Sequence, residues 1–195
     1  MGKLVYLMGK SSSGKDTIYK ELLNTPELKL KKVVLYTTRP IRYNEKEGVQ
    51  YHFVDEDKYK ELLNSGKVIE DRSYNTYHGV WRYFTLDDGM IDLENHNYLI
   101  IGTLESFLKT ADYYNRKNVL PVYLEIDDGI RLQRALNREM MQENPKYEEM
   151  CRRFLADTED FSEEKLKNAG INIRFNNEDL GKCLDSIKEY LVEYI

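Results

Sequence analysis

LVYLMGKSSSGKDT, residues Leu4 to Thr17, joins an apolar run to a glycine- and serine-rich turn. Four residues separate Gly9 from Gly14 and Lys15, which is the spacing of a phosphate-binding loop between a buried strand and a helix. Glycine lets the backbone turn tightly there, so that several amide N–H groups can point at one anion. The helix that follows, at about residues 14–23, adds its partly positive N-terminus at the same point. The stretch therefore predicts an α/β fold with an anion site after its first strand.

The side chains of this loop suit the phosphate chain of ATP. Lys15 supplies a mobile positive charge for the outer phosphates. Asp16 stands where Ser or Thr is usual, and the hydroxyl of Thr17 follows one position later, where we expect it to reach Mg²⁺ through its waters. Two alternatives stay open: Asp16 weakens triphosphate binding, or the turn binds no ligand. The loop residues expected to bind ATP are Gly9, Ser11, Ser12, Ser13, Gly14, Lys15, Asp16 and Thr17.

The composition is that of a soluble globular protein. The chain has 195 residues, 41% of them hydrophobic and 32% charged, which is enough to bury one core. A net charge of −5 argues against a general nucleic-acid binder, and no apolar run approaches the ~20 residues that span a bilayer. Cys151 and Cys183 lack metal-ligand spacing and are expected to be free thiols. We expect a cytoplasmic protein that binds small-molecule nucleotides and neither nucleic acid nor membrane; the oligomeric state stays open.

Short apolar runs alternate with helical periodicities along the chain. The pattern predicts strands at residues 4–8, 33–36, 68–69, 98–101, 119–126 and 171–175. It predicts helices at residues 14–23, 56–63, 86–93, 104–114, 130–140, 147–166 and 180–194. Such alternation is typical of a parallel sheet with helices on both faces. With the phosphate loop, it predicts the P-loop NTPase fold in a single domain.

A second motif follows the expected second strand: from residue 37 to residue 54 the chain reads TTRPIRYNEKEGVQYHFV. Arg39 and Arg42 lie three positions apart in a loop, where two planar guanidinium groups can bind one phosphate dianion from two sides. Tyr51 offers a phenolic donor to the same group. The alternative is a solvated loop whose arginines pair with Glu45 and Glu47.

Together the two motifs resemble the guanylate kinase family, whose members carry T-T-R-x-x-R, then E and G, then Y-x-F-V at this distance behind the phosphate loop. The resemblance implies a nucleoside monophosphate kinase that converts ATP and GMP to ADP and GDP with Mg²⁺. It implies one domain, residues 1–195, with three parts: a core at about 1–35, 84–127 and 161–195, an acceptor-binding insert at about 36–83, and a helical lid at about 128–160.

The resemblance also implies how the acceptor base is read. Glu70 corresponds to a family carboxylate that accepts hydrogen bonds from guanine N1–H and the exocyclic amine, which adenine cannot offer. His78 and Gly79 stand at the family's Y-Y-G-[ST] motif, which reads Tyr77-His78-Gly79-Val80 in this chain. Val80 therefore replaces the hydroxyl that helps to read the base.

Two further departures concern the acceptor and the metal. Leu35 stands where the family has a serine, and Thr103 lies at a strand end where the family has aspartates. Glu125 or Asp127, at the end of the next strand, could compensate. Two alternatives thus stay open: a kinase for a different nucleotide or phosphorylated metabolite, and a catalytically silent interaction module. The retained phosphate loop argues against the second.

Arginines in the expected lid complete the resemblance. Arg131, Arg134 and Arg138 share one helix face, and the family's R-x-x-x-R matches the last two. Arg153 matches an arginine of the second lid helix, and Asn177 an asparagine near the ATP base. Positive charge over the transferring phosphoryl group suits its loose transition state; the alternative is surface ion pairing. The residues expected to act in catalysis are Lys15, Arg39, Arg134, Arg138 and Arg153.

Overall fold

The structure, a computed structural model, describes residues 1–76 and 79–195. The strands are β1 (Leu4–Gly9), β2 (Leu30–Lys32), β3 (Leu35–Thr37), β4 (Tyr51–Phe53), β5 (Val68–Thr76), β6 (Gly79–Leu86), β7 (Asn97–Gly102), β8 (Val119–Glu125) and β9 (Arg174–Asn176). The helices are α1 (Lys15–Leu23), α2 (Glu56–Asn64), α3 (Leu104–Tyr114), α4 (Asp128–Met140), α5 (Tyr147–Asp160), α6 (Glu163–Asn168) and α7 (Leu180–Tyr194). Two 3₁₀ turns, η1 (Pro26–Leu28) and η2 (Arg116–Asn118), complete these elements.

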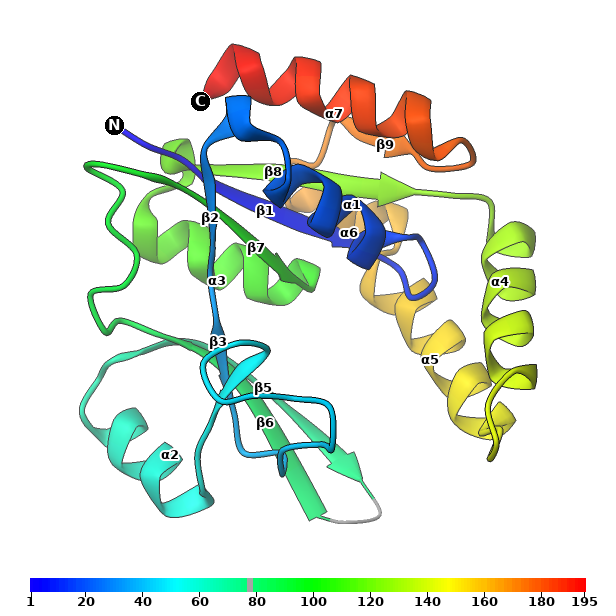
Figure 1. The fold of residues 1–195 in the computed structure, drawn as a ribbon, viewed down its shortest axis with the longest axis horizontal. Helices are drawn as coiled ribbons and strands as arrows, with labels where there is room; N and C mark the ends of the chain where they lie inside the picture. The colour runs from blue at the N-terminus through cyan, green and yellow to red at the C-terminus, as the bar shows by residue number, and fades with distance from the viewer. Residues whose placement is uncertain (77–78) are drawn as a thin grey trace.

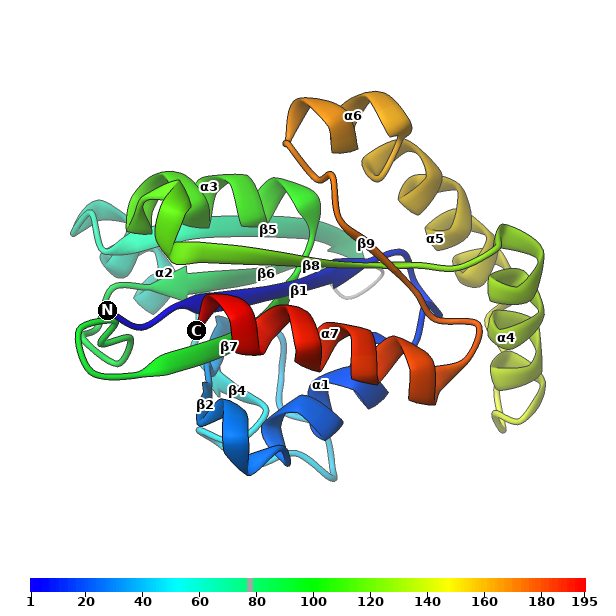
Figure 2. The same cartoon turned by 90° about the horizontal axis from the view of Figure 1, so that it is seen from above.

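A five-stranded parallel sheet, in the order β2-β7-β1-β8-β9, forms the centre of the fold. Helices α1 and α7 cover one face, and α3 and α6 cover the other (Figure 2). Every residue of β1 is buried, because a strand with helices on both sides must be apolar on both faces. The predicted parallel sheet with two covered faces is confirmed. In the part of the chain that the structure describes, no helix is both long and apolar enough to cross a bilayer.

A second, four-stranded sheet in the order β4-β3-β6-β5 lies beside the central one, with α2 next to it (Figure 1). The prediction of one strand at residues 33–36 was wrong. Residues 30–32 instead pair with β7, and the chain then crosses to the second sheet as β3. The expected two-residue strand at 68–69 is the start of a nine-residue strand, β5, which pairs with β6 as an antiparallel hairpin.

The helix expected at residues 86–93 is absent, and this segment is an irregular connection. Asp88 and Asp92 accept hydrogen bonds from the backbone N–H groups of Met90 (2.9 Å) and Glu94 (3.0 Å), and Gly89 has φ +79°. Such side-chain bonds to the backbone two residues ahead favour turns over helix. The helical spacing of the apolar residues was therefore misleading here.

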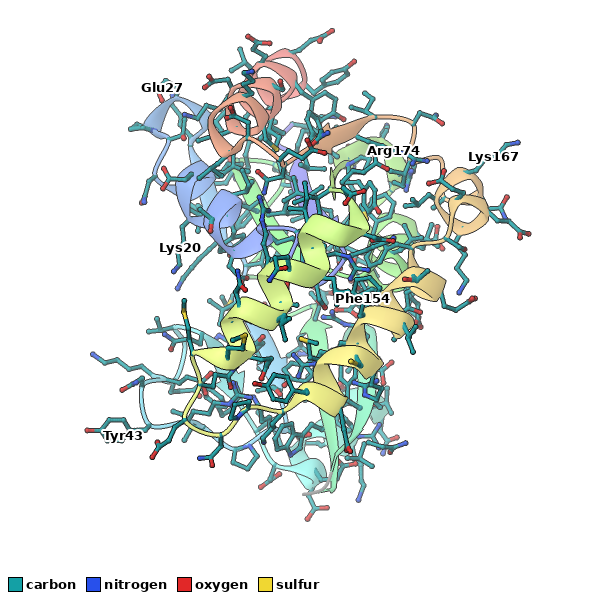
Figure 3. The ribbon with its side chains drawn as sticks, turned by 90° about the vertical axis from the view of Figure 1, so that its right-hand side faces the viewer. Lys20, Glu27, Tyr43, Phe154, Lys167 and Arg174 are labelled. Carbon is teal, nitrogen blue, oxygen red and sulfur yellow. The ribbon has the colours of Figure 1, made fainter. Side chains whose placement is uncertain are left out.

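Helices α4 and α5 run side by side and project from the end of β8 (Figures 1 and 3). The single helix expected at 147–166 was wrong, because α5 ends at Asp160 and α6 begins at Glu163. Between them Phe161 is buried and stacks on Tyr123 at a ring-centroid distance of 5.6 Å. This contact anchors the turn that leads from the projecting helices back to the core. The last strand lies at 174–176, later than the predicted 171–175.

Candidate active site

The loop after β1 has the backbone geometry of an anion site. Gly14 has φ +90° and caps α1 without a side-chain hydrogen bond, and a Cβ at this position would overlap the amide of Asn177. Ser12 also has a positive φ, 63°. The hydroxyl oxygens of Ser12 and Ser13 are buried and lack a hydrogen-bond partner among the described residues. Glycine is therefore required at position 14, and the loop keeps polar groups free for a ligand.

Lys15 is turned back onto the loop that precedes it. Its Nζ donates to the carbonyl oxygens of Gly9 (2.6 Å) and Lys10 (2.7 Å). Burial lowers the pKa of Lys15 to about 8, against the opposing effect of the carboxylates of Asp157 and Asp16. The ammonium group thus lies against the backbone of the loop, where a phosphate oxygen would replace carbonyl oxygens as its acceptor.

An aspartate from α5 contacts the same loop. The Ser11 N–H donates to Asp157 Oδ2 at 2.7 Å. The Arg131 guanidinium donates to Asp157 Oδ2 (3.3 Å) and to Asp128 Oδ1 (3.0 Å) and lies 3.8 Å from the ring centroid of Phe154, which Figure 3 labels between α4 and α5. The sequence showed only that Arg131 shares a face with the expected lid arginines. No sequence signal marked Asp157.

The other arginines of these helices differ in position. Arg134 Nη2 donates to the carbonyl oxygen of Asn177 at 3.2 Å. Arg138 lies close enough to Lys15 to contribute to lowering its pKa. Arg153 is 58% exposed and donates to Glu149 Oε1 at 2.8 Å. Arg134 thus contacts Asn177, and Arg138 acts electrostatically on Lys15. Arg153 instead forms an exposed ion pair, as the alternative interpretation predicts.

Asn177 connects the loop to the edge of the central sheet. Its side-chain nitrogen donates to the carbonyl oxygen of Ser13 at 2.7 Å, and its backbone N–H donates to the Glu125 carbonyl at 2.9 Å. Asp16 and Thr17 are exposed in the first turn of α1. No group of three or more His, Cys, Asp or Glu side chains that could hold a metal ion is found within residues 1–76 and 79–195.

A cavity of about 430 Å³ lies at the carboxyl ends of β8 and β9. Its lining includes Lys10 of the loop, Glu125, Asp128, Asn176 and Glu178. Ligands of open α/β sheets bind beyond the carboxyl ends of the strands. Because its carboxylates repel phosphate, this cavity suits the uncharged parts of a nucleotide better than the phosphate chain.

The second motif forms a compact site around Arg39. Arg39 is 3% exposed, and its two terminal nitrogens donate to the two carboxylate oxygens of Glu45, at 2.9 and 2.7 Å. The Arg42 N–H donates to the same carboxylate at 2.9 Å, and the Arg42 residue is exposed. The Arg39 guanidinium lies 5.5 Å from the ring centroid of Tyr51. Arg39 and Tyr51 are thus neighbours, as expected, and Arg39 pairs with Glu45, as in the alternative interpretation.

Glu70 is buried in β5 beside an arginine that sequence reasoning missed. Thr85 Oγ1 donates to Glu70 Oε1 at 2.7 Å, and Arg72 Nε lies 3.2 Å from Glu70 Oε2. Burial raises the pKa of Glu70, and the charge of Arg72 opposes that rise. Gly79, with φ +107°, begins β6. His78 lies outside the described residues.

The positions that depart from the family pattern have roles of their own. Leu35 is buried in the core, whereas Val80 is 44% exposed. Thr103 caps α3: its hydroxyl accepts from the Ser106 N–H (3.3 Å), and Ser106 Oγ accepts from the Thr103 N–H (2.9 Å). Such a cap contributes about 1 kcal/mol to helix stability. Two carboxylates could replace the strand-end aspartates of the family. Asp127 caps α4, and Glu125 pairs with Arg174 at 2.9 Å.

Comparisons with known proteins identify the family. A guanylate kinase family model matches residues 1–82. The chain is 30% identical to the guanylate kinase of Mycoplasma mobile over 194 residues, which cover 97% of this chain and 92% of that protein. The chain belongs to the guanylate kinase family. It is also 27% identical to the guanylate kinase of Malacoplasma penetrans, over 100% of this chain and 94% of that one.

The fold of this guanylate kinase family member agrees with that assignment. The crystal structure of the guanylate kinase from Anaplasma phagocytophilum superposes with a TM-score of 0.64 at 23% identity, over 100% of this chain and 87% of that one. The predicted α/β fold is therefore confirmed, and the sequence identity to the Mycoplasma mobile enzyme confirms the resemblance drawn from the two motifs.

Proposed function

We propose that this protein transfers the γ-phosphoryl group of ATP to GMP, giving ADP and GDP. The observation that carries the proposal is the intact phosphate loop, in which Gly14 has the required positive φ and the Lys15 ammonium lies against the loop backbone. A silent interaction module would have no need of this geometry. Family membership and the buried Arg39 of the second motif support the same conclusion.

Three parts of the chain would cooperate in this reaction: the core, an acceptor insert at about residues 36–83, and a lid at about 128–160. Two pKa shifts that act between these parts support their convergence. Burial and the nearby Tyr51 of the insert raise the pKa of Tyr19 in α1 to about 12. Burial also raises the pKa of Tyr74 in β5, and Asp160 of α5 adds to that rise. Closure of the lid over the insert would exclude water, which otherwise competes as the acceptor.

In the proposed reaction, an oxygen of the GMP phosphate attacks the γ-phosphorus, and the bond to the bridging oxygen of ADP breaks. Lys15 and the loop amides would hold the donor phosphates, with Asn177 near the base. Arg39, Arg42 and Tyr51 would hold the acceptor phosphate, and Arg134 and Arg138 would balance the charge between the two.

Mg²⁺ fits the donor atoms at the loop, because it prefers oxygen ligands and the exposed Thr17 hydroxyl and Asp16 carboxylate lie in the first turn of α1. When bound, Mg²⁺ neutralises charge on the β- and γ-phosphate oxygens. Thr17 would contribute through the metal's waters. Asp16 would contribute a second oxygen or the charge that keeps Lys15 protonated.

One observation favours a broader acceptor class. Since Arg72 lies 3.2 Å from Glu70, the pair offers N–H donors as well as a carboxylate oxygen. That combination suits any base with an N–H beside a C=O, an edge that guanine shares with hypoxanthine, xanthine and uracil. GMP, IMP, XMP and UMP would then all be acceptors, while AMP and CMP, which lack such an N–H, would be rejected.

An acceptor screen tests both versions. ADP release is measured with GMP, IMP, XMP, AMP, CMP and UMP, and ATP affinity is measured separately by calorimetry. GMP turnover supports the main proposal, and comparable IMP turnover supports the broader class. Failure of GMP while another acceptor reacts would reject guanylate specificity. Absence of ATP binding at millimolar concentration would favour the silent module.

A further inference from the structure

Two helices that project from the core reach back to the phosphate loop through charged side chains. Lys10 Nζ lies 3.2 Å from Asp128 Oδ1 of α4, and the Ser11 N–H donates to Asp157 Oδ2 of α5 at 2.7 Å. Arg131 bridges the two aspartates, at 3.0 Å from Asp128 and 3.3 Å from Asp157. We refer to Lys10, Ser11, Asp128, Arg131 and Asp157 as the Arg131 network.

The contact of Asp157 is the kind that a phosphate oxygen makes. Amide N–H groups of such a loop bind anionic oxygens, and Asp157 presents a negatively charged oxygen to one of them. Its partner Arg131 is a guanidinium, which binds carboxylates and phosphates with the same planar set of donors. The Asp157 carboxylate therefore contacts the loop in the way expected of a phosphate oxygen of the donor nucleotide.

Arg131 is arranged for a further anionic partner. Its side chain is 1% exposed, and its Nη2 is buried without a hydrogen-bond partner in the described part of the chain. A buried guanidinium is costly unless its donors are satisfied. Its charge also acts on Lys15, since it contributes to lowering the Lys15 pKa. A phosphate held by the loop and Lys15 would be close to this unsatisfied donor.

We propose that Arg131 binds the phosphate chain of the donor nucleotide, and that Asp157 occupies the loop until the nucleotide displaces it. The inference rests on the proposed function, in which the loop binds ATP. Asp128 keeps Arg131 in place from within α4, while Asp157 exchanges its contact with the Ser11 amide for solvent or for another donor. Arg131 is thus a donor-site residue in addition to the arginines inferred from the sequence.

A purely structural role for the ion pair makes a different prediction. If Arg131 and Asp157 only hold α4 and α5 against the loop, then removing either side chain breaks the same ion pair. Both removals would then change nucleotide affinity in the same direction. If Asp157 competes with phosphate and Arg131 binds it, the two removals have opposite effects. The sign of the two changes distinguishes the two roles.

The experiment measures calorimetric dissociation constants of the full-length protein for ATP and for inorganic tripolyphosphate. Asp157→Asn keeps the shape of the side chain and removes its charge, so both ligands should bind roughly tenfold more tightly. Arg131→Met keeps the stem against Phe154 and removes the guanidinium, so both should bind roughly tenfold more weakly. The double variant should bind more weakly than Asp157→Asn alone, because direct phosphate contacts are lost.

Matched controls come from exposed ion pairs of α5. Arg152→Met and Glu159→Gln remove partners of Glu149 and Lys165, respectively, and should leave both dissociation constants within about twofold. Melting temperatures of all variants report whether the fold is kept. If Arg131→Met does not fold, Arg131→Lys replaces it, and the tightening expected for Asp157→Asn is decisive by itself.

The outcomes separate this inference from the proposed function. If the unmodified protein binds ATP and Asp157→Asn leaves affinity unchanged or lower, the displacement is refuted while the kinase proposal stands. Equal affinities of the double variant and Asp157→Asn would refute the phosphate contact of Arg131. If the unmodified protein binds neither ATP nor tripolyphosphate, both proposals fail together.

Discussion

Each of the two candidate phosphate sites contains a carboxylate. The two carboxylates differ in how far along the chain they lie from the groups that they contact. At the acceptor site, Glu45 pairs with Arg39, six residues away in the same loop. At the donor site, Asp157 accepts from the Ser11 amide, 146 residues away. The first pair is a property of one segment, whereas the second exists only because α5 packs back onto the loop.

This difference suggests different roles for the two carboxylates. Glu45 also accepts from the Arg42 N–H, so it shapes the loop that carries both arginines and can stay in place when a phosphate binds to them. Asp157 occupies a loop amide that the donor phosphate needs. Glu45, which is close to Arg39 in the sequence, would therefore support phosphate binding. Asp157, which comes from the distant helix α5, would oppose phosphate binding until α5 moves away from the loop.

The largest expected effect is on the donor phosphate site, and it would come from removing the Lys15 charge. Lys15→Ala should lower the rate of ADP formation by about a hundredfold or more, because one preorganised charge at the transferring phosphoryl group is lost. Steady-state kinetics measure the rate, and circular dichroism checks that the fold is kept. A rate within a few-fold of the unmodified protein would exclude Lys15 from the site.

Removing an arginine from the acceptor site should have a smaller effect, and it should change the binding of the acceptor but not of ATP. Arg39→Ala should raise the acceptor KM by roughly thirtyfold, since a bidentate phosphate contact is lost, and should leave the dissociation constant of ATP unchanged. Kinetics with varied acceptor and calorimetry with ATP measure the two. Unchanged acceptor affinity would count against the assignment of Arg39, and a parallel loss of ATP affinity would show that the two halves are not separable.

The affinity of the donor site for ATP should also depend on pH. With its pKa lowered to about 8, Lys15 loses its proton as the pH rises through that value. The anionic nucleotide prefers the charged form, so ATP affinity should fall roughly tenfold between pH 7 and pH 9. Calorimetry across this range measures the change. Lys15→Arg, which stays charged, is the control, and an equal fall in that variant would assign the effect to another group.

The smallest expected effect compares the two carboxylates directly. Glu45→Gln should weaken acceptor binding by roughly fivefold, because the Arg39 side chain loses a charged partner that orients it. The sign is opposite to that expected for Asp157→Asn and ATP. Acceptor KM values measure it. Tighter acceptor binding in Glu45→Gln would mean that both carboxylates compete with phosphate, and the contrast between local and distant partners would disappear.

The sequence predicted those parts of the molecule whose signals are local. The β1 strand, the phosphate loop and the α3 and α7 helices follow from spacing and periodicity within single segments. The segment at 86–93 was misread as a helix because apolar spacing was given more weight than the aspartates that form its turns. The division of residues 30–37 between two sheets was missed because residues 30–32 read Leu-Lys-Lys, and lysine is depleted in strands, whereas the strand-forming residues begin at Val33.

What the sequence by itself determined is the family, the anion loop and the arginine motif, since glycine spacing and paired arginines act over a few residues. The tertiary structure alone decided that Arg131 and Asp157 meet at Ser11 and that Arg72 lies against Glu70. Which arginine becomes buried depends on how helices pack on a loop more than a hundred residues away. The energy of a buried charge depends on all its neighbours at once.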